Sequence, residues 1–238
     1  SVPSSTAMNC PKGVDYEPDH AYVFVAGYGS NTFTTVDVSL EYSPAVSGSV
    51  QDSTYLGGAW GLVYDSDQRR SFVAGSTSNS VAYVNVSAFE APFIETNRSF
   101  VNATYLAGAR GISYDSTNDL LFVAAYDADK LTILKFDSDG ALTYSDHLAL
   151  DTGDAPTAVT HDSVHNRVYV ACSGTARVVY ANYSSTGEFS ISTIYALNVS
   201  SSVLDGISDI KYDTFNSRLY TAAESADTVA AIDVDLDQ

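Results

Sequence analysis

The residues best suited to chemistry in this sequence stand at positions where otherwise similar segments of the chain differ from one another. Four residues before a recurring landmark, the first three segments carry Lys12, Trp60 and Arg110. A tryptophan ring beside polar groups is what a carbohydrate site uses, because the apolar face of a pyranose stacks on the ring while its hydroxyls take directed hydrogen bonds. These positions therefore predict a ligand-binding site.

Other variable residues are expected on the same face of the molecule. Tyr28, Tyr126 and Glu224 stand where two other segments have serine, and Asp209 stands where the others have glycine or alanine. The predicted ligand-binding residues are thus Lys12, Tyr28, Trp60, Arg110, Tyr126, Asp209 and Glu224. Polar turn residues accompany them at Asn31, Asn79, Asp129 and Asp227. A packing role stays open for the aromatic residues, since a tryptophan also fills the space between two segments and a tyrosine also caps a strand.

Two aspartates suggest a metal site. Asp127 and Asp129 in YDADK, with Asp154, offer oxygens to a hard cation such as Ca²⁺, which takes six or more. No other cofactor is expected. The spacing of His161 and His165 in a strand end and turn does not favour zinc, and His161 replaces an aromatic residue, which indicates packing.

A repeat of about 50 residues provides the framework for these positions. Its landmark is followed eight residues later by an aromatic residue that opens a β-rich run, and the landmarks are Tyr16, Tyr64, Tyr114, His161 and Tyr212. Within a copy, runs of Val, Ile, Tyr, Phe and Thr alternate with turns of Gly, Asn, Asp and Ser, and no apolar period of helical length appears. Each copy is therefore predicted to hold four short strands.

Four antiparallel strands per copy predict a blade of a β-propeller, and five copies predict one all-β, five-bladed domain over residues 1–238. The blades are expected to begin near residues 13, 61, 111, 158 and 207. The last copy shows three strands, so we expect residues 1–11 to supply its fourth as a closing strand. Lys211 and Asp15 are predicted to pair at that closure.

What recurs in every blade is expected to build the blade. An acidic residue follows each landmark and is predicted to accept backbone hydrogen bonds in the turn between the first and second strands. These residues are Glu17, Asp65, Asp115, Asp162 and Asp213.

Charge excludes several classes of partner. The chain has 11 basic and 29 acidic residues and a net charge of −18, which repels phosphate backbones and anionic lipid surfaces. No apolar run reaches the roughly 20 residues that a membrane span needs, and the first ten residues lack the features of a signal peptide. We expect no nucleic-acid binding and no membrane insertion of this segment.

Glycosylation motifs favour an extracellular, cell-surface or virion-surface location. The N-x-S/T sequence occurs at Asn85, Asn97, Asn102, Asn182 and Asn198. A contrary interpretation is that Asn85 and Asn182 hold the same place in two repeats and are not independent. Cys10 and Cys172 are the two cysteines; a disulfide between them is one alternative, and a small buried side chain at Cys172 is the other.

One stretch carries a family resemblance. AYVFVAGYGSNTFTTVDVS, followed by DSTYLGGAWGL, resembles the LVIVD-repeat group of surface-associated, YVTN- and NHL-like β-propellers. The resemblance covers nearly the whole chain, although the fourth and fifth copies depart from it at YANYS and after Asp233. It implies the propeller fold and no defined chemistry.

The sequence thus favours a non-enzymatic recognition module that binds a glycan or an extracellular protein through its variable loop face. The alternatives are a structural surface or virion component and a glycoside hydrolase-like enzyme. The hydrolase would need two carboxyl groups about 5 Å or about 6.5–9.5 Å apart. Its candidates would be Asp15, Asp154, Asp205 and Asp209.

Overall fold

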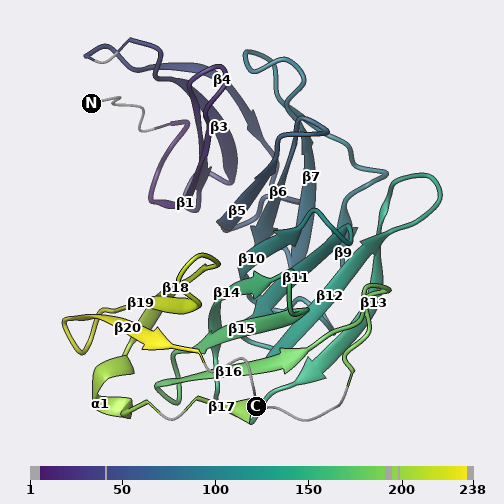
Figure 1. Ribbon diagram of the computed structural model, residues 1–238. Coiled ribbons are helices and arrows are strands. Elements are labelled where there is room, and N and C mark those ends of the chain that lie inside the picture. Colours follow the sequence, from purple (N-terminus) through teal and green to yellow (C-terminus); the bar gives the residue numbers. More distant parts are fainter. Residues whose placement is uncertain (1–5, 41, 191–194, 198, 235–238) are drawn as a thin grey trace. The chain divides into compact units, whose positions relative to one another are not determined.

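The computed structural model describes residues 6–40, 42–190, 195–197 and 199–234, and these form an all-β fold of antiparallel sheets with one four-residue helix (Figure 1). The arrangement is a five-bladed β-propeller, which confirms the predicted fold class. No described helix has the length and apolar character needed to cross a membrane.

In four of the five sheets, four strands are hydrogen-bonded to one another in chain order. The first contains β1 (Pro11–Glu17), β2 (Tyr22–Gly27), β3 (Thr32–Asp37) and β4 (Ala45–Gln51). The second contains β5 (Ala59–Asp65), β6 (Arg70–Gly75), β7 (Ser80–Asn85) and β8 (Phe93–Ile94), with β9 (Phe100–Val101) also paired to β7.

The third sheet contains β10 (Ala109–Asp115), β11 (Leu120–Ala125), β12 (Lys130–Phe136) and β13 (Leu142–Ala149). The fourth contains β14 (Pro156–Asp162), β15 (Arg167–Cys172), β16 (Arg177–Asn182) and β17 (Tyr195–Ala196). The helix α1 (Ser201–Leu204) precedes the fifth sheet, whose described strands are β18 (Ile207–Asp213), β19 (Arg218–Ala223) and β20 (Thr228–Asp233).

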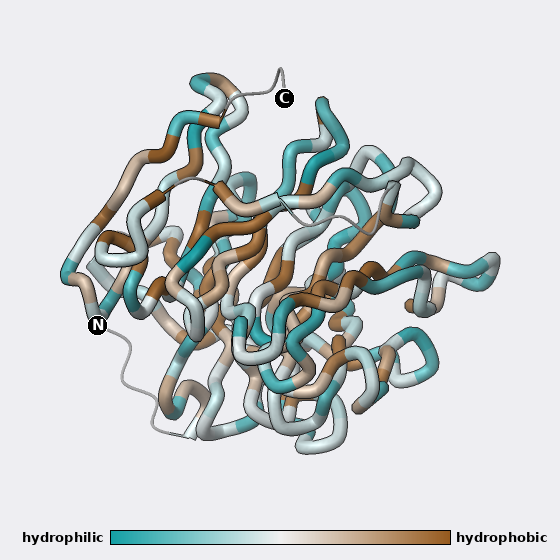
Figure 2. Tube along the Cα trace, turned by 90° about the horizontal axis from the view of Figure 1, so that it is seen from below, coloured by the Kyte–Doolittle hydropathy of each residue, from teal (hydrophilic) through white to brown (hydrophobic). Residues whose placement is uncertain are grey.

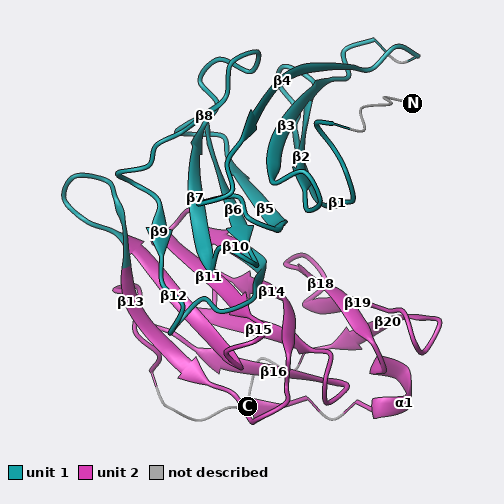
Figure 3. Ribbon diagram, turned by 180° about the vertical axis from the view of Figure 1, so that it is seen from behind, with its two compact units in different colours: residues 1–112, 136–143 teal, residues 113–135, 144–238 magenta. Residues whose placement is uncertain are grey.

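The chain forms two compact units (Figure 3). The first unit comprises Ser1–Ile112 with Phe136–Thr143, and the second comprises Ser113–Lys135 with Tyr144–Gln238. In the first unit, Phe24, Phe33 and Val73 belong to the buried core between sheets. In the second, Tyr169 and Leu219 belong to a comparable core.

Apolar residues follow the strands and polar residues gather at the turns (Figure 2). The second strands β6, β11 and β15 bury every residue. A strand covered on both faces needs a nearly continuous apolar run instead of an alternating one, as LLFVAA in β11 shows.

The recurring acidic residues hold the first turn of each blade, as predicted. In all five copies the side chain accepts the backbone N–H groups of the residues two and three positions later, as Asp115 Oδ1 does from Thr117 and Asn118 at 2.9 and 3.4 Å. The acid therefore fixes the turn that reverses the chain between the first two strands.

A second polar residue links consecutive blades, and the sequence did not suggest this role. Asn31, Asn79 and Asp129 lie in the turn between the second and third strands with φ of 53°, 53° and 47°. Asn31 Oδ1 accepts the N–H of Gly58 at 2.9 Å, and Asn79 Oδ1 accepts that of Gly108 at 3.1 Å. Each residue thus tolerates the left-handed turn and also anchors the loop that leads into the next blade.

The expected closing strand over residues 1–11 is not found in its described part. Pro11 begins β1, which pairs with β2 in the first sheet. Ahead of it, Asn9 and Cys10 accept hydrogen bonds from the backbone N–H groups of Gly29 and Tyr28. Residues 6–10 therefore lie against the first blade, because its turn offers unpaired N–H donors, and residues 1–5 lie outside the described residues.

Replacing Asn79 tests the link between blades. Asn79→Ala is expected to lower the free energy of unfolding by about 2 kcal/mol, because it loses the bond to Gly108 and places alanine at positive φ. Asn79→Gly removes only the hydrogen bond and should cost about half as much. Urea titration measures both, with the exposed Asn97→Ala as control. Equal stabilities of all three variants would contradict the assignment.

Candidate functional site

Three of the variable residues stand on neighbouring first strands of the first unit. Lys12 lies in β1, Trp60 in β5 and Arg110 in β10. A glycine follows each of them in the sequence. A Cβ atom added to Gly13 would lie 2.3 Å from the carbonyl oxygen of Trp60, and one added to Gly61 would lie 2.3 Å from that of Arg110. The glycines therefore allow the three strands to approach closely, with β5 between the other two.

Two of these residues lie where the pairing of their strand with the next is irregular. The register between β1 and β2 shifts between Pro11 and Gly13, and the register between β5 and β6 shifts between Ala59 and Leu62. Lys12 and Trp60 lie within these β-bulges. A bulge turns a side chain away from its regular direction, which makes it suited to presenting a functional group.

The structure brings the three side chains together on the tryptophan ring. Lys12 Nζ lies 4.8 Å from the centroid of the Trp60 ring, and Arg110 Cζ lies 4.4 Å from it. Both distances fit cation–π contacts. Because β5 lies between β1 and β10, the two cations reach Trp60 from the strands on either side of it.

Tyr28 completes the group. It follows β2, and its ring meets that of Trp60 edge-on, with centroids 5.4 Å apart and an interplanar angle of 88°. Lys12 is exposed, while Tyr28, Trp60 and Arg110 are half-buried. We call these four residues the Trp60 cluster. It joins four of the seven predicted ligand-binding residues in one unit.

The other three predicted residues belong to the second unit. Tyr126 follows β11 and is half-buried, and Glu224 follows β19 and is exposed. Asp209 lies in β18, where its Oδ1 accepts the backbone N–H of Ile210 at 2.8 Å. Asp209 and Lys211 line a shallow pocket of about 180 Å³ whose surface is mostly apolar.

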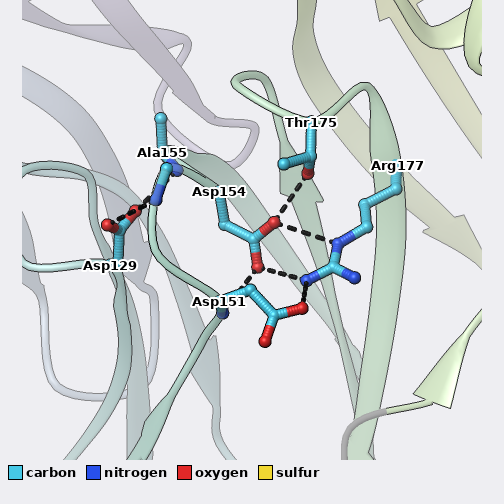
Figure 4. A network of polar contacts seen from close by, with 7 residues as sticks. Asp129, Asp151, Asp154, Ala155, Thr175 and Arg177 are labelled. Atoms are coloured by element: carbon cyan, nitrogen blue, oxygen red, sulfur yellow. Dashed lines mark hydrogen bonds and ion pairs between the residues drawn. The ribbon is translucent and has the colours of Figure 1, made fainter.

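Asp129 and Asp154, two of the predicted calcium ligands, bind other groups of the protein (Figure 4). The carboxylate of Asp129 accepts the N–H groups of Gly153 and Ala155 at 2.9 and 2.8 Å. Asp154 is fully buried and pairs with Arg177, whose Nη2 lies 2.6 Å from Oδ2. Asp127 is exposed. In the described part of the chain, no three His, Cys, Asp or Glu residues form a group that could hold a metal ion, so the calcium prediction is not supported.

The network around Asp154 is a structural ion pair. Thr175 Oγ1 donates to Asp154 Oδ1 at 2.6 Å, and Arg177 reaches Asp151 as well at 2.6 Å. The hydrogen bond to Asp154 is the largest factor that raises the pKa of Arg177 above its ordinary value. Both oxygens of Asp154 are therefore bound by Thr175 and Arg177 within the protein.

Two of the other carboxylates proposed for a hydrolase, Asp15 and Asp209, accept backbone hydrogen bonds nearby. Asp15 accepts the N–H groups of Tyr16 and Tyr64 at 2.8 Å each, so both of its oxygens bind the backbone of β1 and β5. Its pair with Lys211, which belongs to the second unit, stays a prediction. Asp205 ends helix α1. The local contacts of these carboxylates give no support to a glycosidase pair.

A serine and a histidine meet in the second unit, and sequence reasoning did not connect them. Ser113 Oγ lies 2.8 Å from His161 Nδ1, and the His161 ring lies 5.8 Å from that of Phe122. Asp115, one of the recurring acids, accepts a hydrogen bond from the hydroxyl of Tyr183 at 2.8 Å. His161 is thus held as a packing residue, as its place in the repeat predicted.

The cysteines are both free thiols. Cys10 is exposed and Cys172 is buried. The disulfide prediction is therefore not supported, and the alternative of a small buried side chain at Cys172 describes the structure. Burial raises the pKa of the Cys172 thiol to about 12, which makes it unreactive.

The glycosylation motifs differ in accessibility. Asn97 is exposed. Asn85 Nδ2 donates to Glu95 Oε1 at 2.8 Å, Asn102 Oδ1 accepts the N–H of Thr104 at 2.8 Å, and Asn182 Oδ1 accepts from Arg167 at 3.3 Å. Asn198 lies outside the described residues. Asn97 is therefore the best placed acceptor, and modification of all five remains a prediction.

No protein-family model and no curated protein matches this sequence. Solved structures do resemble it. A putative 6-phosphogluconolactonase from Bacteroides fragilis NCTC 9343 is 12% identical, with a TM-score of 0.75 over 95% of this chain and 68% of that chain. Virginiamycin B lyase from Staphylococcus aureus is 13% identical, with a TM-score of 0.64 over 97% and 71%.

A chain in a nidogen/laminin complex is 17% identical, with a TM-score of 0.66 over 94% of this chain and 76% of that chain. The similar structures therefore include two described as enzymes and one found in a protein complex. At such low identity the similarity shows the β-propeller fold alone, because one fold carries many functions.

Removing the partner of buried Asp154 should be costly. Arg177→Met is expected to lower the free energy of unfolding by about 3 kcal/mol, since it leaves a fully buried carboxylate without its cation. Arg218→Met breaks the exposed pair with Asp233 and should change stability little. Urea titration compares the two variants. Similar losses in both would show that burial does not distinguish these ion pairs.

His161 should make stability depend on pH. Burial is the main cause that lowers its pKa below the ordinary 6.5, and the nearby carboxylates of Asp115 and Asp162 only partly oppose it. The unfolded chain then binds a proton before the folded chain does, so stability falls as the pH falls below 6.5, by at most about 1.4 kcal/mol per pH unit. His161→Tyr, which restores the repeat residue, should remove this part of the slope between pH 7.5 and 5.5. An unchanged slope would contradict the assignment.

Proposed function

We propose that this chain is a non-catalytic, extracellular recognition propeller whose ligand site is the Trp60 cluster, with a glycan as its ligand. One observation carries the proposal: residues that differ between the blades, and that no blade needs, come together as Lys12, Tyr28, Trp60 and Arg110. The acidic residues that recur in every blade hold the turns. The residues of the Trp60 cluster do not recur, and we therefore assign them to ligand binding.

The composition of the cluster supports recognition of a polar ligand. It combines two aromatic rings with an ammonium group, a guanidinium group and a phenol, which together offer hydrogen-bond donors beside apolar surface. The β-bulges at Lys12 and Trp60 present these groups on a rigid sheet. The glycosylation motifs support the extracellular location, and the resemblance to surface-associated LVIVD-repeat propellers agrees with it.

Catalysis finds less support. The similar structures described as a lactonase and a lyase show that this fold can hold an active site. In this chain, Asp15 and Asp154 have oxygens committed to backbone groups or to Arg177. A binding role therefore suits the described residues better than hydrolysis.

A glycan array with the deglycosylated protein tests the proposal. We expect Trp60→Ala to reduce binding at least tenfold, because it removes the ring on which the other three side chains converge. Trp60→Phe should retain part of the affinity. Chelation of calcium should have no effect, because the predicted ligands Asp129 and Asp154 are engaged elsewhere.

The matched control is Phe215→Ala, which removes a highly exposed aromatic ring from the turn between β18 and β19. Its binding should equal that of the unaltered chain. Circular dichroism of Trp60→Ala separates a lost site from a lost fold. Binding that persists in a folded Trp60→Ala variant would place the site elsewhere, and no binding of any glycan would refute the proposal.

A further inference from the structure

The contacts of the Trp60 ring indicate which class of glycan would bind, and this step rests on the proposed function. A neutral pyranose would stack on the Trp60 ring. That ring already contacts two side chains, with Lys12 Nζ at 4.8 Å and Arg110 Cζ at 4.4 Å from its centroid. A ligand that reaches this ring therefore meets positive charge beside it.

The positive charge of the cluster is unusual for this protein. The chain carries −18, whereas the Trp60 cluster holds two cations and no carboxylate. Lys12 is exposed and forms no ion pair with any residue that the structure describes. An aromatic ring holds it in place. A cation fixed in this way is prepared for an anion from outside.

We propose that the ligand of the Trp60 cluster is a glycan that bears carboxylate groups, such as an oligo-uronide. The exposed ammonium group of Lys12 provides the contact to a carboxylate, and the guanidinium group of Arg110 on the same ring adds to the positive charge there. Tyr28, whose ring meets Trp60 edge-on, adds a phenol to the cluster. Uronides alternate carboxylates with hydroxyls and apolar ring surface, which suits cations placed among aromatic rings better than an acidic peptide does.

The overall charge limits the length of this ligand. Repulsion from the rest of the surface acts over about 8 Å at physiological salt, so it affects the parts of a long polyanion that extend beyond the cluster. The cluster contributes only two cations. Short oligomers are therefore expected to bind as well as long chains, or better.

Two probes with the same backbone separate charge from shape. We use a galacturonic acid tetramer and its methyl ester, measured by calorimetry at physiological salt. The acid should bind at least tenfold more tightly than the ester, because esterification removes the charge and leaves the rings. Equal affinities would overturn the proposed ligand class while leaving a glycan-binding function intact. Failure of both probes and of the glycan array would instead refute the function itself.

A charge variant makes the test specific to the site. Lys12→Gln should weaken binding of the acid about five- to tenfold and leave binding of the ester unchanged. Lys12 is exposed, so the fold should not suffer. The matched control is Lys211→Gln, which removes the same charge from an exposed lysine of β18 and should not change binding. Equal losses in both variants, or tighter binding of a glutamate peptide than of the tetramer, would overturn the proposal.

Discussion

The framework depends on one hydrogen bond that recurs between blades. A residue with a short polar side chain turns the chain at positive φ and binds a backbone N–H of the loop that begins the next blade, as Asn31 does with Gly58 and Asn79 with Gly108. Few side chains tolerate that backbone conformation and also reach that donor. The bond therefore sets the spacing between one blade and the loop that leads to the first strand of the next, where Trp60 and Arg110 lie.

The candidate site is built from side chains that the blades do not need for their own packing. Close approach of the first strands requires Gly13 and Gly61, and the bulges beside them release Lys12 and Trp60 from strand packing. The side chain before each glycine thus stands at a position that can vary without disturbing the sheet. Variation between the blades at this position produces a lysine, a tryptophan and an arginine in a row, and cation–π contacts hold them together.

The repeat allowed the blades, their strand order and the acidic turns to be predicted, because those features depend on local spacing. The roles of Asn79 and Asp129 were missed, since a hydrogen bond to a loop more than twenty residues away leaves no local pattern. The Lys-Gly and Trp-Gly pairs were a signal for the bulges that could have been used. The ion pair of Asp154 with Arg177 could not be predicted, because Asp154 precedes β14 whereas Thr175 lies in the turn before β16 and Arg177 begins β16.

Trp60 is the sole tryptophan of the chain. Its indole ring lies among two positive charges and a phenol, so its excited state experiences the electric field of these groups. Selective excitation of indole therefore reports on the Trp60 cluster and on no other part of the protein. An anion that approaches Lys12 or Arg110 alters that field, and the protein carries its own optical reporter of occupancy without any added label.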